Sequence, residues 1–187
     1  MHLRIWRYIN FMYPPFSRGL YSIAHFFGLY FALQILAANH NLVITHGSIA
    51  GCLTVFFFLM FLRVGDELKD LEIDLRLFPE RALPSGNVTV PDLSFLLGVV
   101  ILIMFAINMF YGNALIAFLL LFGYGFLMFK FFFYPEIISK SLILALVTHN
   151  PVIIIINCFI VDRIDSRKFF ILGNCSGDLS CSIDSNI

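Results

Sequence analysis

Long apolar segments alternate with short polar ones along the chain. Five apolar segments each approach the roughly 20 residues that an α-helix needs to cross the hydrocarbon core of a bilayer. They cover residues 19–38, 46–62, 93–111, 113–134 and 138–161. Lipid offers no hydrogen-bond partner to a free backbone group, and the segments are too long for barrel strands, so we expect five helices. The pattern predicts an all-α fold, a polytopic transmembrane helical bundle of about five spans within one domain, residues 1–161.

Residues 162–187 do not continue this pattern. They are rich in Ser, Asp, Asn and Gly, with a single short apolar patch at 169–172. Such a segment is too polar for another span, so we expect a disordered polar tail.

The distribution of Lys and Arg predicts the orientation of the spans. The connections 39–45 and 111–113 contain neither residue, so both should face away from the cytoplasm. The basic N-terminus and the charged segment 63–92 then lie on the cytoplasmic side. We expect an integral, multi-pass protein, in a bacterial inner (plasma) membrane. Only the tail conflicts with this topology, because Arg163, Arg167 and Lys168 would emerge on the opposite side.

Composition excludes several classes of protein. With 60% hydrophobic residues, 13% charged residues and 23 Phe among 187 positions, the chain has more apolar surface than a soluble domain of this length can bury. The formal net charge is zero and no basic block occurs, so we expect no nucleic-acid partner. The expected surroundings are membrane lipid. The four cysteines show no CxxC spacing, which supports neither a zinc site nor a disulfide framework.

Charge is concentrated in the segment 63–92, which holds seven of the twelve acidic residues. If the second span continues as a helix beyond the membrane interface, four carboxylates fall within about 100° on one face. These belong to Asp66, Glu67, Asp70 and Asp74.

Like charges four residues apart repel one another on a helix, so this acidic face should need a positive partner. On the same helix, Lys69 and Arg76 fall on another side, which favours a bound cation. Carboxylate oxygens are the ligands that Mg²⁺ prefers, commonly together with phosphate oxygens of a substrate. The alternative is a solvated helix with ion pairs such as that between Glu72 and Arg76. Arg81, in the turn-rich loop 79–86, suits either a diphosphate or a carboxylate of Asp70 or Asp74.

These residues resemble a known family, the UbiA-type intramembrane prenyltransferases. The order Asp-Glu-Leu-Lys-Asp-Leu-Glu-Ile-Asp at 66–74, then Arg-Ala-Leu-Pro-Ser-Gly at 81–86, is similar to the family's first aspartate-rich motif and its RPLPSG-like loop. The family motif reads N-D-x-x-D-x-x-x-D, so Asp70 and Asp74 match it. Asp66 stands where Asn is usual, Glu67 where Asp is usual, and Ala82 replaces Pro.

The resemblance implies an enzyme that uses Mg²⁺ to bind a prenyl diphosphate and transfers the prenyl group to a lipid-soluble, commonly aromatic, acceptor. Asp66, Glu67, Asp70 and Asp74 would then be metal ligands, and Arg81 and Lys69 diphosphate contacts. His149, which precedes Asn150 and Pro151 in the fifth span, is a candidate for an acceptor pocket. A packing histidine in a kinked helix is the alternative.

The resemblance covers only the first five spans. Family members have further spans and a second acidic motif in a later cytoplasmic loop. Asp162 and Asp165 have a DxxD spacing but should lie on the opposite face. We therefore expect a prenyltransferase-like chain that is truncated or has an altered reading frame. The alternatives are an inactive remnant, a chain that depends on a partner subunit for the missing half, and a cation-handling membrane protein.

Overall fold

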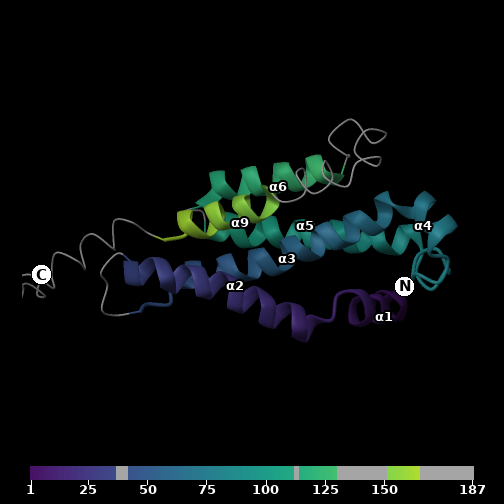
Figure 1. Cartoon of the computed structure of the whole chain (residues 1–187), viewed down its shortest axis with the longest axis horizontal. Coiled ribbons are helices and arrows are strands. Elements are labelled where there is room, and N and C mark those ends of the chain that lie inside the picture. The colour runs from purple at the N-terminus through teal and green to yellow at the C-terminus, as the bar shows by residue number, and fades with distance from the viewer. Residues whose placement is uncertain (37–41, 112–113, 130–150, 165–187) are drawn as a thin grey trace, which may run out of the picture.

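The computed structural model describes residues 1–36, 42–111, 114–129 and 151–164, and every regular element in these ranges is a helix (Figure 1). The all-α prediction is therefore confirmed for this part of the chain. The helices are α1 (His2–Met12), α2 (Pro15–Leu36), α3 (His46–Lys69), α4 (Leu71–Leu77), α5 (Val90–Phe110), α6 (Leu115–Phe129) and α9 (Pro151–Asp162).

Three of these helices, α2, α3 and α5, are long and apolar enough to cross a membrane. They contain 22, 24 and 21 residues and coincide with the first three predicted spans. The shorter apolar helix α6 lies within the fourth predicted span, 113–134, and α9 overlaps the fifth, 138–161, ending one residue beyond it. Residues 130–150, with His149, and residues 165–187 lie outside the described part. More than three spans therefore remains a prediction, as does the disordered tail.

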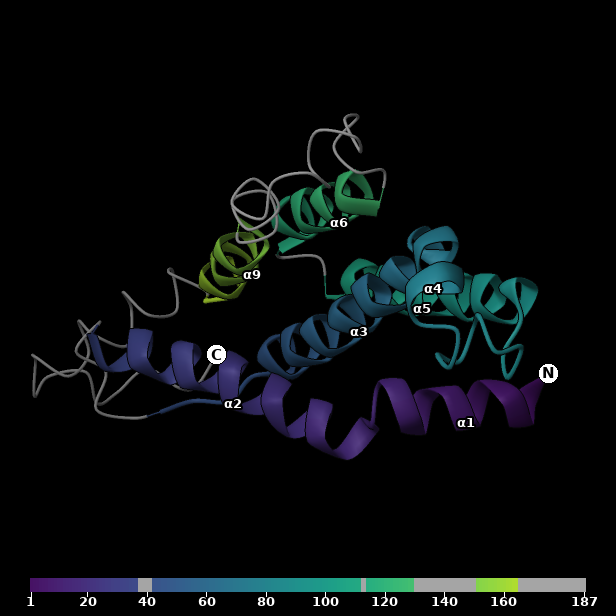
Figure 2. The same cartoon turned by 45° about the vertical axis from the view of Figure 1, so that its right-hand side comes forward.

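Helix α3 is the centre of the bundle. It contacts α2, α4, α5 and α6, and Figures 1 and 2 show it with α1 and α2 on one side and α6 on the other. In an apolar stretch of 18 residues taken from each helix, 56% of the residues of α3 are buried, compared with 22% in α2 and 28% in α5. Phe58, Phe61 and Val64 of α3 are almost fully buried. The apolar core is therefore built around α3.

Polar caps fix where the two best-buried spans begin. At the start of α3, the amide of Ser48 donates to Thr45 Oγ1 at 3.1 Å, and the amide of Thr45 donates to Ser48 Oγ at 3.0 Å. At the start of α5, the amide of Thr89 donates to Asp92 Oδ2 at 3.2 Å. Reciprocal bonds of this type satisfy backbone groups that a helix terminus leaves free.

A buried polar network joins α3, α5 and α9. The side-chain amide of Asn108 donates to Thr54 Oγ1 at 2.9 Å and to the Met104 carbonyl at 2.8 Å. Arg163, directly after α9, donates to Asn108 Oδ1 and, at 2.9 Å, to the Tyr111 carbonyl at the end of α5.

The sequence predicted Arg163 as part of the polar tail, but its side chain is buried. The free carbonyls at the C-terminus of α5 explain this, because they attract a positive charge and need donors. Arg163 thereby holds the end of α9 against the end of α5.

Two glycines of α6 give a matched test of how closely it packs on α3. A Cβ at Gly125 would lie 2.8 Å from a ring carbon of the fully buried Phe58, whereas a Cβ at Gly123 would meet nothing within 4 Å. We expect Gly125→Ala to lower the free energy of unfolding by about 1 to 3 kcal/mol through overpacking. Gly123→Ala should be neutral or slightly stabilising, because Ala favours a helix. Thermal unfolding in one detergent measures both, and equal stabilities would contradict this packing.

Candidate functional site

The candidate site lies at the end of α3, where α4 and the loop 78–89 fold back over the bundle (Figures 1 and 2). The sequence predicted one helix through Asp74, and this prediction is wrong. Helix α3 ends at Lys69, Asp70 has φ −90° and ψ 7°, and α4 starts at Leu71. These dihedral angles lie in the sparsely populated bridge region, outside the helical one. The regular helix is therefore interrupted at Asp70, although Asp74 stays close enough to Glu67 and Asp70 for their charges to interact.

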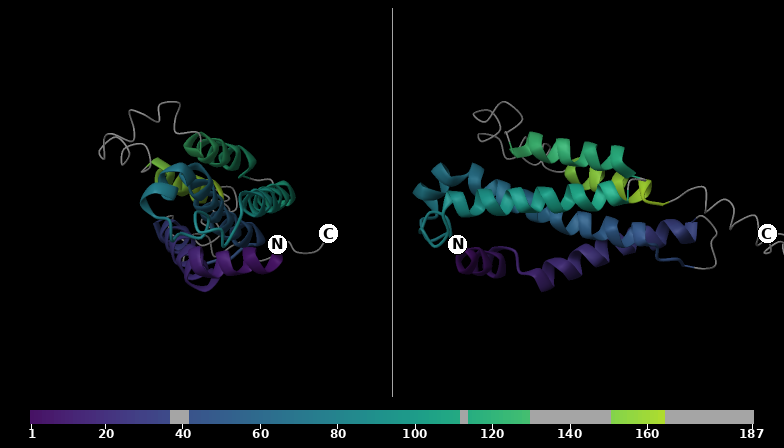
Figure 3. Two further views of the ribbon diagram at one scale, coloured as in Figure 1. Left: turned by 90° about the vertical axis from the view of Figure 1, so that its right-hand side faces the viewer. Right: turned by 180° about the vertical axis from the view of Figure 1, so that it is seen from behind.

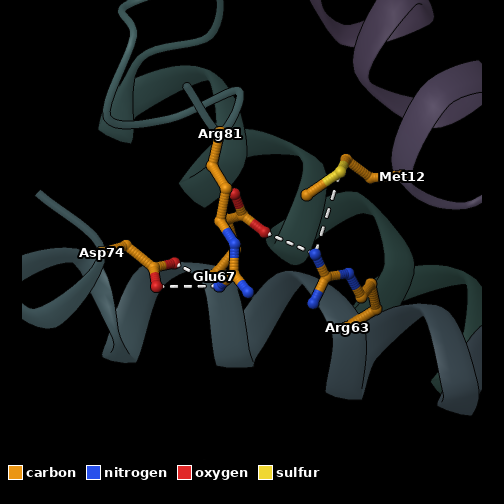
Figure 4. A network of polar contacts seen from close by, with 5 residues as sticks. All are labelled: Met12, Arg63, Glu67, Asp74 and Arg81. Carbon is orange, nitrogen blue, oxygen red and sulfur yellow. Dashed lines mark hydrogen bonds and ion pairs between the residues drawn. The ribbon is translucent and has the colours of Figure 1, made fainter. Parts of the chain in front are cut away.

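Arg81 reaches from the loop to Asp74 of α4 (Figure 4). Its Nη1 atom lies 2.8 Å from Asp74 Oδ1 and 2.7 Å from Oδ2. The Asp74 side chain is only 4% exposed and that of Arg81 is 38% exposed. The hydrogen bond with Asp74 raises the pKa of the Arg81 guanidinium, which also lies over the Phe78 ring at 4.4 Å. The sequence allowed Arg81 to bind either a diphosphate or a carboxylate of Asp70 or Asp74. In the structure it pairs with the carboxylate of Asp74.

Glu67 lies next to this pair and is buried at the end of α3 (Figure 4). Its Oε2 accepts from Arg63 Nη2 at 2.8 Å, and the same nitrogen lies 3.8 Å from Met12 Sδ. Its other oxygen, Oε1, is buried and makes no hydrogen bond of normal geometry with another described residue. The Arg63 contact is an i,i+4 pair, so the spacing could have revealed it from the sequence.

Tyr8 of α1 was not anticipated at this site. Its hydroxyl is buried and also lacks a hydrogen-bond partner among the described residues. Burial raises the pKa of Tyr8 and the Glu67 carboxylate raises it further, so the two groups lie close enough to interact. An unsatisfied buried polar group costs about 1 to 3 kcal/mol. No sequence pattern links Tyr8 to α3, because the contact depends on how α1 packs.

Asp66 and Lys69 form a separate pair on α3. Lys69 Nζ lies 3.0 Å from Asp66 Oδ1, and the Lys69 side chain is only 7% exposed. The prediction that Lys69 faces away from the acidic residues is therefore wrong, because residues three apart are neighbours on a helix. Glu72 and Arg76, in contrast, form no ion pair with any residue of the described chain.

Asp70 alone of the four predicted metal ligands has no ion pair with another described residue. Burial raises the pKa of its carboxyl. The positive charges of Lys69 and Arg81 lower this pKa, whereas the negative charges of Asp66 and Asp74 raise it further. Asp70 is thus the least compensated negative charge at the site.

The electrostatic reason to infer a bound cation has to be revised. Arg63, Lys69 and Arg81 each pair with one carboxylate, so the protein itself supplies most of the positive charge. Within the described ranges, no three Asp, Glu, His or Cys side chains are grouped closely enough to hold a metal ion. The oxygen donors still suit Mg²⁺, which commonly uses one or two carboxylates and completes its shell with water and phosphate oxygens. Asp70, which forms no ion pair with another described residue, could contribute to such a shell together with Asp66 or Asp74, the two carboxylates whose charges act on it.

The ion pair of Arg81 with Asp74 can be tested by substitution. We expect Arg81→Met to lower the free energy of unfolding by about 2 to 3 kcal/mol, because it leaves the Asp74 carboxylate charged and buried without a partner. The loss should be smaller than for a fully buried ion pair, because the Arg81 side chain is partly exposed to solvent. Adding Asp74→Asn to this variant should recover most of the loss. Chemical unfolding in detergent measures both, and a double variant no more stable than Arg81→Met would contradict the coupling.

The raised pKa of Asp70 predicts a pH-dependent cost to stability. Folding favours the protonated carboxyl, so stability should fall as the pH rises from the ordinary value of 3.8 through the raised pKa. We expect Asp70→Asn to be more stable than the unmodified protein at pH 7, because the substitution removes the buried negative charge. The difference should disappear at acidic pH. Glu72→Gln, at an exposed position of α4, is the control for melting temperatures across pH. A less stable Asp70→Asn at pH 7 would contradict the prediction.

Comparison of the chain with protein-family models, curated proteins and solved structures finds no match. The resemblance to UbiA-type prenyltransferases therefore remains a prediction from the residues of segment 63–92. A function for this chain has to be argued from its own side chains and their geometry.

Proposed function

We propose that the protein binds a prenyl diphosphate together with Mg²⁺ at the end of α3 and transfers the prenyl group to a lipid-soluble acceptor. The observation that carries this proposal is the geometry around Glu67. A buried carboxylate oxygen of Glu67 and the buried hydroxyl of Tyr8, both without a hydrogen-bond partner of normal geometry in the described chain, lie at the last turn of α3, the helix that ends directly before Asp70 in the chain. Buried polar groups are almost always satisfied, and exceptions call for a functional explanation.

The charges near these groups suit a diphosphate. Arg81 and Arg63 hold their guanidinium groups against Asp74 and Glu67 from a loop and from α3. Guanidinium groups bind phosphate oxygens through paired N–H donors, so either arginine could exchange a carboxylate for a phosphate. Asp70 and a neighbouring aspartate supply carboxylate oxygens of the type that Mg²⁺ accepts. When bound, Mg²⁺ neutralises the negative charge that develops on a departing diphosphate.

The side chains beside Asp66 are apolar. Asp66 lines a narrow crevice between α3 and α6 together with Phe61, Gly65 and Gly125. The crevice has a volume of about 10 Å³, room for about one water molecule, so a prenyl chain would bind there only after α3 and α6 move apart. Its apolar, partly aromatic lining suits a hydrocarbon chain and excludes water from a reactive intermediate.

The proposed reaction breaks the bond between the allylic carbon and the diphosphate oxygen. The bonding electrons leave with the diphosphate, an acceptor atom forms a bond to the prenyl carbon, and the acceptor releases a proton. In this scheme the arginines would bind the diphosphate, and Asp70 would hold the Mg²⁺ that neutralises it. Preorganised charges of this kind stabilise charge that develops in a transition state.

One observation favours the alternative of an inactive or partner-dependent chain. Within the described residues, the acidic side chains outside the segment 66–80 are Asp92 and Asp162. Asp92 is held by Arg4, with 3.0 Å between Nε and Oδ2, and by Thr89. Asp162 ends α9 beside Arg163, which binds the far end of α5. Neither belongs to a second cluster of acidic residues, so a second acidic motif would have to come from residues 130–150 or 165–187, or from a partner subunit.

The proposal predicts Mg²⁺-dependent binding of a prenyl diphosphate to the purified chain in detergent. We expect farnesyl diphosphate to bind with Mg²⁺ and at least about tenfold more weakly without it, since the metal neutralises the diphosphate. Asp70→Asn should weaken binding by a similar factor, whereas Glu72→Gln should not. Isothermal titration calorimetry measures the affinity. Binding that is absent, or that both substitutions affect equally, would contradict a metal-assisted site at Asp70.

Transfer is tested separately with a radiolabelled prenyl diphosphate and a panel of lipid-soluble aromatic acceptors. A labelled product that depends on Asp70 would support catalysis by this chain. Binding without any product would instead support the partner-dependent alternative.

A further inference from the structure

A second cavity lies between α1 and the loop that precedes α5, outside the acidic site. Its volume is about 650 Å³, and its lining combines basic, amide and aromatic side chains. One wall is formed by the α1 residues Arg4, Trp6, Arg7, Tyr8, Asn10 and Phe11. Glu80, Ala82, Asn87 and Val88 of the loop form the other. This volume is within the range of about 300 to 1,000 Å³ that is typical of small-molecule sites.

Helix α1 has the character of a helix that lies in a membrane interface. Ile5 and Tyr8 are buried against the bundle, whereas Leu3, Trp6 and Phe11 are exposed. The left view of Figure 3 looks along the long axis of the bundle, and α1 is seen there from its side. The axis of α1 is therefore not parallel to the long axis of the bundle. Exposed aromatic and aliphatic side chains beside arginines are typical of interfacial helices. The mouth of the cavity should therefore lie at the level of the lipid headgroups.

The charges around the cavity favour an anionic occupant. Arg7 is exposed and forms no ion pair with another described residue. Arg4 uses Nε and Nη2 for Asp92, at 3.0 and 3.3 Å. Glu80 is the one acidic side chain in the lining. Because Asp92 already neutralises Arg4, the attraction for an anion comes mainly from Arg7, which has no such partner in the described chain. The positive-inside pattern assigns this end of the bundle to the cytoplasmic leaflet, whose anionic lipids attract basic residues by about 1 kcal/mol each.

We propose that this cavity binds the phosphate-bearing headgroup of an anionic phospholipid. Arg7 and the second face of the Arg4 guanidinium bind the phosphate. Asn10 and Asn87 offer amide donors to the headgroup, and Trp6 and Phe11 cover the start of the acyl chains. The bound lipid joins α1 to the loop that carries Arg81. This inference does not rest on prenyl transfer, because its ligand and its basic residues differ from those of the acidic site, although Tyr8 borders both.

The test compares two lipids and one free anion on the purified full chain in a zwitterionic detergent, without Mg²⁺ or prenyl diphosphate. We expect dioctanoyl phosphatidylglycerol to raise the midpoint of thermal unfolding in a saturable manner. Dioctanoyl phosphatidylcholine and inorganic phosphate at equal concentration should not. Equal shifts with both lipids would overturn the charge-based assignment. A phosphate shift equal to that of phosphatidylglycerol would overturn the lipid as occupant.

Matched variants locate the effect. Arg7→Gln should weaken binding of phosphatidylglycerol about fivefold, the factor that corresponds to one basic contact near an anionic lipid. Arg18→Gln removes an exposed arginine of α2 that does not line the cavity, so it should leave the affinity unchanged. Equal losses in the two variants would show general surface attraction and overturn the proposal.

Asn10→Trp provides an independent variant, since it fills the cavity and keeps both arginines. We expect it to remove the shift with phosphatidylglycerol while the unfolding midpoint without lipid stays close to that of the unmodified protein, because Asn10 is exposed. An unchanged affinity in Asn10→Trp would overturn binding in this cavity.

Discussion

The burial of α3 is the constraint on which the rest of the structure depends. Four other helices pack around it, and its burial extends to Glu67, two residues before the helix ends. A carboxylate in that position needs compensation, because burying an unpaired charge is costly. Arg63 from the preceding turn supplies it, with the loop after α4 folded over the same end. The shape of the site thus follows from ending a buried helix with acidic residues.

Polar groups organise both ends of the bundle in similar ways. At one end, Asp92 connects the start of α5 to α1 through Arg4. At the other end, Arg163 connects the last turn of α5 to α9, with Asn108 and Thr54 beneath it. Apolar packing in lipid provides little direction by itself, whereas hydrogen bonds between spans fix which helices meet. The two clusters therefore define the register of α5 against its neighbours.

Internal ion pairs at the acidic site have a consequence for ligand binding. Any cation or diphosphate there competes with Arg63, Lys69 and Arg81, each of which already neutralises a carboxylate. Asp70 forms no ion pair with another described residue, so a ligand could bind its carboxylate without breaking an existing pair. The lipid-facing cavity differs in this respect, because Arg7 needs no exchange of partners. The two regions share the loop 78–89, so events in one can alter the position of Arg81 in the other.

The sequence by itself determined that the chain is helical and rich in membrane-spanning segments, because run length and apolar character depend only on local composition. It also located the acidic residues and Arg81 in one segment. Tertiary structure decided the rest. The regular helix was interrupted at Asp70, Arg81 became the partner of Asp74, Tyr8 came to lie near Glu67, and Arg163 moved inside the bundle. Each of these depends on contacts between residues distant in the chain or on a single pair of backbone dihedral angles, and an ideal helical repeat encodes neither.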